Sequence, residues 1–162
     1  MVRFNLFIII SLVLCTASCG QKAFDKHLKK LYSGTVPLVN QEELQNPDGV
    51  LFLDTRSQEE FDVSHIEGAQ FIDYDTFQPD QVIDLPRDTT IVVYCSVGYR
   101  SERIGEKLQE MGFTNVKNLY GGIFDWKNKD NEIVNPKGQP TDSVHTYNFV
   151  WSKWLQKGTK VY

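Results

Sequence analysis

The sequence predicts an α/β fold with a mostly parallel central sheet. Two observations carry this prediction: short apolar or β-branched runs recur along the chain, and short helical patterns lie between them. A third observation is that residues 50–53 are continuously apolar, as expected of a strand buried on both faces of a parallel sheet.

The elements can be placed in order from local signals. Strands are expected at residues 36–39, 50–53, 69–72, 91–94 and 116–119. Asn40 with Glu43, and Ser57 with Glu60, form capping boxes that open short helices. A longer helix is expected from Ser101, with apolar side chains at helical spacing and a stop at residue 112.

The N-terminus differs in character from the rest of the chain. One positive charge, Arg3, precedes an apolar run over residues 4–14, which is too short to cross a hydrocarbon core of about 30 Å. Residues 16–19, Thr-Ala-Ser-Cys, resemble a bacterial lipobox, in which small residues precede a lipidated cysteine. The prediction is a lipoprotein signal peptide over residues 1–18 and a lipid anchor on Cys19, followed by a linker and helix to residue 35. An ordinary signal peptide and a buried N-terminal helix are the alternatives.

The lipobox implies an exported protein anchored to a bacterial membrane, on the periplasmic or outer cell-envelope side. The net charge of −4 argues against nucleic acid as a partner, because phosphate binding needs a basic face. Of the three cysteines, cleavage removes Cys15 and lipidation consumes Cys19. Cys95 is then the one free thiol, which excludes a disulfide framework and a cysteine metal cluster.

The C-terminal extension, residues 128–162, begins with a polar loop. Thr141 can cap a final helix that carries Tyr147, Trp151 and Trp154 on one face. An aromatic stripe at helical spacing usually packs into a core, so we expect this amphipathic helix to pack on the domain. A surface for a partner or a membrane is the alternative.

The stretch with the most chemical information follows the strand at residues 91–94. It places Cys95 at a strand end, and then a tight loop and a helix start. Loop N–H groups and the helix N-terminus together attract anions and favour the thiolate form of a cysteine. Gly98 allows a positive φ, and Arg100 offers several donors to an oxyanion.

This loop, Cys-Ser-Val-Gly-Tyr-Arg-Ser, resembles the active-site loop of the rhodanese family of sulfurtransferases. The stretch LFLDTRSQEEFDVSHIEGAQFIDY is similar to the family's first signature, and the residues from 85 to 126 to its second. The resemblance covers residues 36–127. It implies a rhodanese-like three-layer fold, with helices on both faces of the sheet, and a reaction that needs no metal and no cofactor.

The resemblance also assigns roles to residues. Cys95 and Arg100 are the expected catalytic pair. The N–H groups of the loop would hold the substrate, which gives substrate-binding roles to Ser96, Val97, Gly98, Tyr99 and Ser101. Asp54, Arg56 and Glu60 resemble an internal ion-pair network and His65 a packing turn, so these four are expected to support the structure. The alternatives are a catalytic part for Asp54 at its strand end and a general-base part for His65.

Loop length separates activities on this fold. In the family, sulfurtransferases have six residues from Cys to Arg, whereas related phosphatases and arsenate reductases have seven. The count from Cys95 to Arg100 is six. The resemblance therefore implies sulfur transfer through a Cys95 persulfide, from a small sulfur-containing anion such as thiosulfate to a thiol, cyanide or protein acceptor. Two alternatives stay open: a sulfur-carrier or protein-interaction module of low turnover, and a phosphatase or arsenate reductase.

Overall fold

The computed structural model describes residues 20–44 and 49–162. The chain divides into two compact units, Met1–Leu31 and Tyr32–Tyr162. In the first unit, residues 20–31 are helical. The expected signal peptide, residues 1–18, and the expected anchor, Cys19, lie outside the described residues. In the described part of the chain, no helix is both long and apolar enough to cross a membrane.

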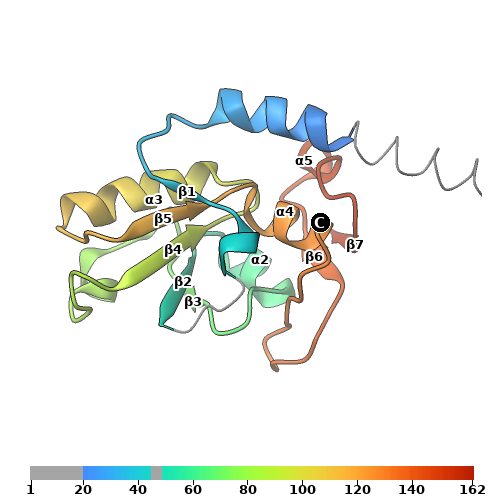
Figure 1. Cartoon of the computed structure of the whole chain (residues 1–162). Helices are drawn as coiled ribbons and strands as arrows, with labels where there is room; N and C mark the ends of the chain where they lie inside the picture. Colours follow the sequence, from blue (N-terminus) through green and yellow to red (C-terminus); the bar gives the residue numbers. More distant parts are fainter. Residues whose placement is uncertain (1–19, 45–48) are drawn as a thin grey trace, which may run out of the picture. The chain divides into compact units, whose positions relative to one another are not determined.

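The second unit is built on a parallel sheet of five strands, in the order β1-β5-β4-β2-β3 (Figure 1). The strands are β1 (Leu38–Val39), β2 (Val50–Asp54), β3 (Gln70–Phe71), β4 (Thr90–Tyr94) and β5 (Val116–Leu119). All neighbouring strands pair in parallel, with β4 between β2 and β5. The predicted parallel sheet is confirmed, although β1 and β3 are only two residues long.

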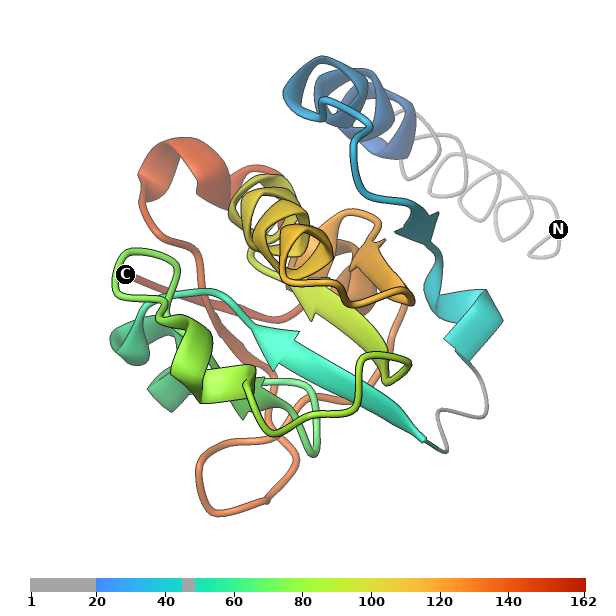
Figure 2. The ribbon, with the colours of Figure 1, turned by 90° about the vertical axis from the view of Figure 1, so that its left-hand side faces the viewer.

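Helices cover both faces of the sheet, because successive side chains of a strand point to opposite faces. On one face, Leu53 and Val93 share a buried core with Ile104 of α3 (Tyr99–Glu110). On the other face, the ring of Phe52 meets Trp126 of α4 (Gly122–Asn128) edge-on, with 6.0 Å between centroids. Figure 2 shows α3 running along its face of the sheet. The predicted three-layer arrangement is therefore confirmed.

Local capping signals explain where the short helices begin. The Asn40 N–H donates to the Glu43 carboxylate at 2.9 Å at the start of η1 (Gln41–Leu44), a 3₁₀ turn. The Ser57 and Glu60 capping box opens α2 (Gln58–Val63), as predicted. A second 3₁₀ turn, η2 (Pro79–Val82), lies in the turn-rich stretch before β4. In contrast, α3 begins two residues before the predicted Ser101.

The predicted amphipathic helix over the C-terminal extension is wrong. That segment forms β6 (Ser143–His145), α5 (Phe149–Ser152) and β7 (Thr159–Val161), and β6 pairs with β7 in parallel. The physical reason is that Asn148 caps a new helix, since its side chain accepts the N–H groups of Val150 and Trp151. Upstream, Val144 is fully buried in strand conformation, so the aromatic stripe is divided between elements.

Candidate functional site

Cys95 lies directly after β4, the central strand of the sheet. Its side chain is buried, and among the described residues it is the free cysteine. The carboxyl ends of parallel strands are where α/β folds bind their ligands. The thiol therefore stands at the place in this fold best suited to chemistry.

The loop after Cys95 turns its carbonyl groups away from the thiol. The four carbonyl oxygens from Cys95 to Gly98 each accept a hydrogen bond from outside the loop, from the Ile123 N–H at 2.9 Å, the Phe124 N–H at 3.2 Å, the Tyr32 hydroxyl at 2.7 Å and the Asn118 amide at 2.9 Å. In a planar trans peptide the N–H points opposite to the carbonyl. The N–H groups of Ser96 to Tyr99 therefore point to the inside of the loop, and that of Gly98 reaches Cys95 Sγ at 3.1 Å.

Two glycines make this close packing possible. Gly98 has φ of 101°, and a Cβ there would lie 2.4 Å from the Tyr32 hydroxyl. Gly122, the first residue of α4, has φ of 58°, and its Cβ would lie 2.2 Å from the Cys95 carbonyl oxygen. Both positions need a left-handed backbone and the absence of a side chain. The start of α4 thus fixes the loop from outside.

Tyr32 binds the loop from 65 residues away in the sequence. Its hydroxyl donates to the Val97 carbonyl and accepts the Gly121 N–H at 2.9 Å. Burial raises the pKa of Tyr32, so the phenol keeps the proton that it donates. One side chain therefore joins the Cys95 loop to the start of α4.

Glu60 connects α2 with the same loop. Its carboxylate accepts both terminal nitrogens of Arg100, at 2.7 and 2.9 Å, and the Ser96 hydroxyl at 2.7 Å. The Ser57 N–H of the capping box supplies a fourth hydrogen bond at 3.1 Å. Two carboxylate oxygens offer about four acceptor positions, so the acceptor capacity of Glu60 is fully used.

The environment fixes the charge of this pair. Burial by itself raises the pKa of Glu60, but the hydrogen bonds and charge of Arg100, with help from Arg56 and Ser96, lower it to about 2. Burial by itself lowers the pKa of Arg100, and the bonds to Glu60 together with the neighbouring Cys95 side chain raise it above its ordinary value. Both groups are therefore ionised at neutral pH, beside the thiol.

The other predicted loop residues have distinct surroundings. Val97 is buried, and Tyr99 is 43% exposed with the Arg103 guanidinium 5.5 Å from its ring centroid. The Ser101 hydroxyl donates to Asn118 at 2.8 Å, so this side chain is bound away from the thiol. The groups that the loop presents on its inside are therefore mainly backbone N–H groups.

The residues expected to support the structure divide into two groups. Asp54 and Arg56, both fully buried, form an ion pair with Arg56 Nη2 2.6 Å from the carboxylate, and the same nitrogen donates to the Ser64 carbonyl. His65 stacks on the Phe61 ring, with 4.0 Å between centroids. These contacts are those that a structural role needs, and that role stays a prediction. Glu60, expected in one network with Asp54 and Arg56, interacts with the charge of Arg56 and also binds the Cys95 loop.

Sequence reasoning missed three residues that shape the site. Tyr32 and Asn118 bind loop carbonyls, and Tyr147 places its ring 5.5 Å from the Arg100 guanidinium carbon. Tyr147 comes from the C-terminal extension, which carried only a helical pattern. None of the three has a local signal for its partner, because each contact depends on how the chain folds back on itself.

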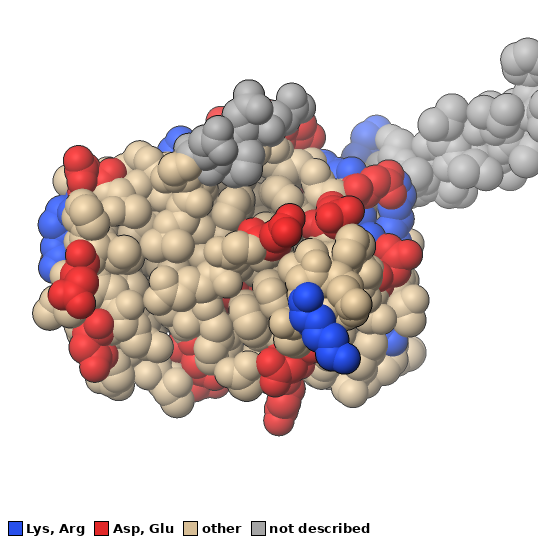
Figure 3. All heavy atoms as spheres, turned by 90° about the horizontal axis from the view of Figure 1, so that it is seen from below, with Lys and Arg blue, Asp and Glu red and all other residues tan. Residues whose placement is uncertain are grey.

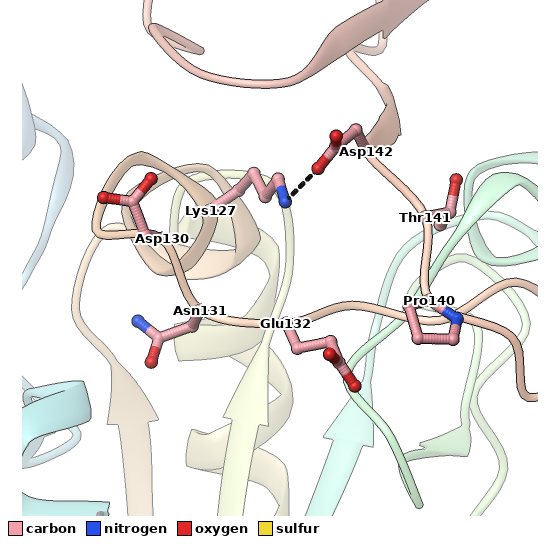
Figure 4. A pocket seen from close by; sticks show the side chains of 7 residues that line it. All are labelled: Lys127, Asp130, Asn131, Glu132, Pro140, Thr141 and Asp142. Atoms are coloured by element: carbon pink, nitrogen blue, oxygen red, sulfur yellow. Dashed lines mark hydrogen bonds and ion pairs between the residues drawn. The ribbon is translucent and has the colours of Figure 1, made fainter.

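A hollow of about 290 Å³ lies on another part of the second unit (Figure 4). Its wall is polar, and Lys127 and Asp142 form an ion pair of 2.5 Å across it. The predicted site residues are not part of its lining. In the described residues there is also no group of His, Cys, Asp and Glu that could hold a metal ion. The Cys95 loop therefore remains the candidate site.

The fold and the site define a class of α/β domains in which a buried cysteine lies between a central parallel strand and a helix. The family model described as Rhodanese-like domain matches residues 39–129. The chain belongs to the rhodanese-like domain family.

Parts of the chain are also similar to curated proteins and to solved structures. The chain is 36% identical over 94 residues to a tRNA uridine(34) hydroxylase of Photorhabdus laumondii, a match that covers 55% of this chain and 26% of that protein. The chain thus spans about a quarter of the length of this curated relative. A crystal structure of a Bacillus halodurans protein has a TM-score of 0.57 at 24% identity, covering 73% of this chain and 88% of that one. A thiosulfate sulfurtransferase from Pseudomonas aeruginosa has a TM-score of 0.56 at 21% identity, covering 62% and 20%. These two likenesses show the fold.

Proposed function

We propose that this protein is a sulfurtransferase that carries sulfane sulfur as a persulfide on Cys95. The observation that carries the proposal is the orientation of the loop. All four carbonyls from Cys95 to Gly98 are bound on the outside, and the Gly98 N–H already donates to Sγ. A ring of inward N–H groups can stabilise the negative charge of a terminal persulfide sulfur.

The reaction is a double displacement. The Cys95 thiolate attacks the outer sulfur of thiosulfate, a new S–S bond forms, and the S–S bond of thiosulfate breaks with its electron pair leaving on sulfite. A thiophilic acceptor such as cyanide or a thiolate then attacks the outer persulfide sulfur, and the Cys95 thiolate leaves. Charge and atoms balance in both steps without an oxidant or a reductant.

Arg100 has a part in this scheme, although Glu60 already binds two of its nitrogens. A guanidinium has five N–H donors, of which the bonds to Glu60 and Ser96 use three. The remaining donors can reach the anionic donor or the leaving group. We expect Arg100 to orient the substrate within a loop whose main attraction for anions comes from the backbone.

The mass of the peptide that contains Cys95 tests the proposal. The full chain is incubated with thiosulfate and digested, and a gain of about 32 Da, one sulfur atom, is expected on this peptide and is lost again after cyanide. Cys95→Ser is the control and should gain nothing. If the folded wild-type protein gains no mass with thiosulfate or with a protein persulfide, the proposal is wrong.

The same experiment separates the two alternatives. A persulfide that forms at once but turns over only with a particular protein acceptor would indicate a carrier of low turnover. No sulfur uptake, together with release of phosphate from an aryl phosphate or reduction of arsenate, would indicate a phosphatase or arsenate reductase. The six-residue loop argues against this last outcome.

The relatives named as tRNA uridine(34) hydroxylases do not add RNA to this proposal. The chain matches only 26% of the length of the Photorhabdus protein, and its own net charge is −4. Figure 3 shows one face of the molecule on which uncharged and acidic side chains predominate. A phosphate-binding surface needs clustered Lys and Arg side chains.

Export and membrane anchoring through Cys19 form a second part of the proposal. The support is the sequence alone: an apolar run and then Thr-Ala-Ser-Cys at residues 16–19. In a bacterial host, wild-type protein should incorporate labelled fatty acid and sediment with membranes, and Cys19→Ser should do neither. Labelling that persists in Cys19→Ser would contradict the anchor.

A further inference from the structure

The chain beyond residue 129 lies outside the family match, yet part of it reaches the candidate site. There β6 pairs with β7 and packs against α2, the helix that carries Glu60. Val144 and Thr146 are fully buried, and the Thr146 N–H and hydroxyl both donate to the Val161 carbonyl. This part of the extension is therefore firmly anchored beside the site.

In the segment between β6 and β7, the backbone turns sharply at Tyr147. The Asn148 N–H donates to the Thr146 carbonyl at 2.7 Å, which closes a three-residue turn with Tyr147 at its centre and φ of 63°. A γ-turn with positive φ is rare and strained, and a tyrosine seldom adopts it. The Tyr147 N–H is satisfied by His145 Nδ1 at 3.1 Å. The turn projects the Tyr147 side chain outward, where it is 56% exposed.

The exposed ring contacts one particular partner. Its centroid lies 5.5 Å from Cζ of Arg100. Arg100 uses its terminal nitrogens for Glu60 and Ser96, and the Tyr147 ring lies near the same guanidinium without hydrogen bonding to it. A cation over an aromatic face is a favourable contact. Tyr147 therefore brings an exposed aromatic ring beside Arg100, the last residue of the six-residue Cys95 loop.

We propose that Tyr147 is a specificity-determining residue that forms a movable outer wall of the entrance to Cys95. This inference rests on the proposed function and adds a size limit on its substrates. Small donors and acceptors such as thiosulfate and cyanide pass with the ring in place. A bulky thiol such as glutathione reaches the persulfide only when the ring leaves Arg100. Moving the ring away breaks an exposed cation–π contact. This loss slows the reaction of the bulky reagent about two- to fivefold.

The test measures how fast glutathione and cyanide each remove sulfur from the Cys95 persulfide of the full chain. Tyr147→Ala should raise the rate constant for glutathione relative to that for cyanide by about two- to fivefold. Tyr147→Phe keeps the ring and should keep the wild-type ratio. Phe149→Ala is the matched control, because it removes an aromatic side chain that is 80% exposed on the same segment. An unchanged ratio in Tyr147→Ala, or an equal change in Phe149→Ala, would overturn the inference.

A second readout does not depend on sulfur transfer. The thiol of Cys95 is alkylated with iodoacetamide or with a bulky maleimide, and each adduct is followed on the peptide that contains Cys95. Tyr147→Ala should favour the maleimide by a similar factor. If this selectivity changes while no variant accepts sulfur, the wall is supported and the proposed function fails. If persulfides form normally and neither ratio changes, the proposed function stands and the wall is refuted.

Discussion

Replacing Glu60 by glutamine tests whether the Glu60–Arg100 pair stabilises the Cys95 loop. The carboxylate is almost completely buried and accepts four hydrogen bonds, three of them from the loop and the first turn of α3. A glutamine amide keeps one oxygen and presents an NH₂ group to a guanidinium that can only donate. We expect Glu60→Gln to lower the free energy of unfolding and to loosen Arg100.

The magnitude follows from the pKa of Glu60. A fall from the ordinary value of 4.5 to about 2 corresponds to about 3 kcal/mol of stability, which agrees with the usual cost of breaking a buried pair. Because the pKa is lower in the folded state, this contribution is complete above about pH 4.5 and is lost as the pH falls towards 2. At pH 3 about 1 kcal/mol should remain.

Urea unfolding of the full chain at pH 7 and pH 3 measures the effect. Glu106→Gln is the matched control, because Glu106 also pairs with an arginine, Arg103 at 2.5 Å, but on the surface. That variant should lose less than about 1 kcal/mol. A loss in Glu60→Gln no larger than in Glu106→Gln, or one that is the same at both pH values, would refute the reasoning.

Two further substitutions test the outer supports of the loop. Gly122→Ala should cost at least about 2 kcal/mol, since its Cβ would lie 2.2 Å from the Cys95 carbonyl oxygen at positive φ. Gly112→Ala, with positive φ but open space, should cost less in the same thermal unfolding assay, and equal costs would exclude the clash as the cause. Tyr32→Phe should cost about 1–3 kcal/mol, because it leaves a buried carbonyl and an N–H unpaired. Tyr162→Phe, at an exposed site, should be neutral, and a neutral Tyr32→Phe would contradict the hydroxyl's role.

The strands and the position of the thiol could be predicted because their signals are local. Continuous apolar runs mark β2 and β4, and the capping box at Ser57 marks α2. The start of α3 was misplaced by two residues. Gly98 itself caps this helix in a left-handed conformation, so Tyr99 and Arg100 already belong to its first turn.

The partners of the loop could not be predicted, because they are remote in sequence. Tyr32 lies 65 residues from Val97, and Asn118 lies 20 residues from Gly98. A tyrosine or an asparagine has the same local pattern whether it binds a loop carbonyl or water. The prediction for the C-terminal extension failed for another reason. Its apolar spacing fits one helix, but the pairing of β6 with β7 and the cap at Asn148 divide the segment into separate elements.

The charge balance at the site limits what can control its reactivity. Glu60 has a pKa of about 2, and that of Arg100 is raised, so this pair keeps both charges from about pH 5 to 9. The field that the pair exerts on the thiol is therefore constant over that range. The hydrogen bonds of the loop N–H groups do not titrate either. A change in the rate of sulfur uptake between pH 5 and 9 therefore does not come from a change in the charges of the Glu60–Arg100 pair.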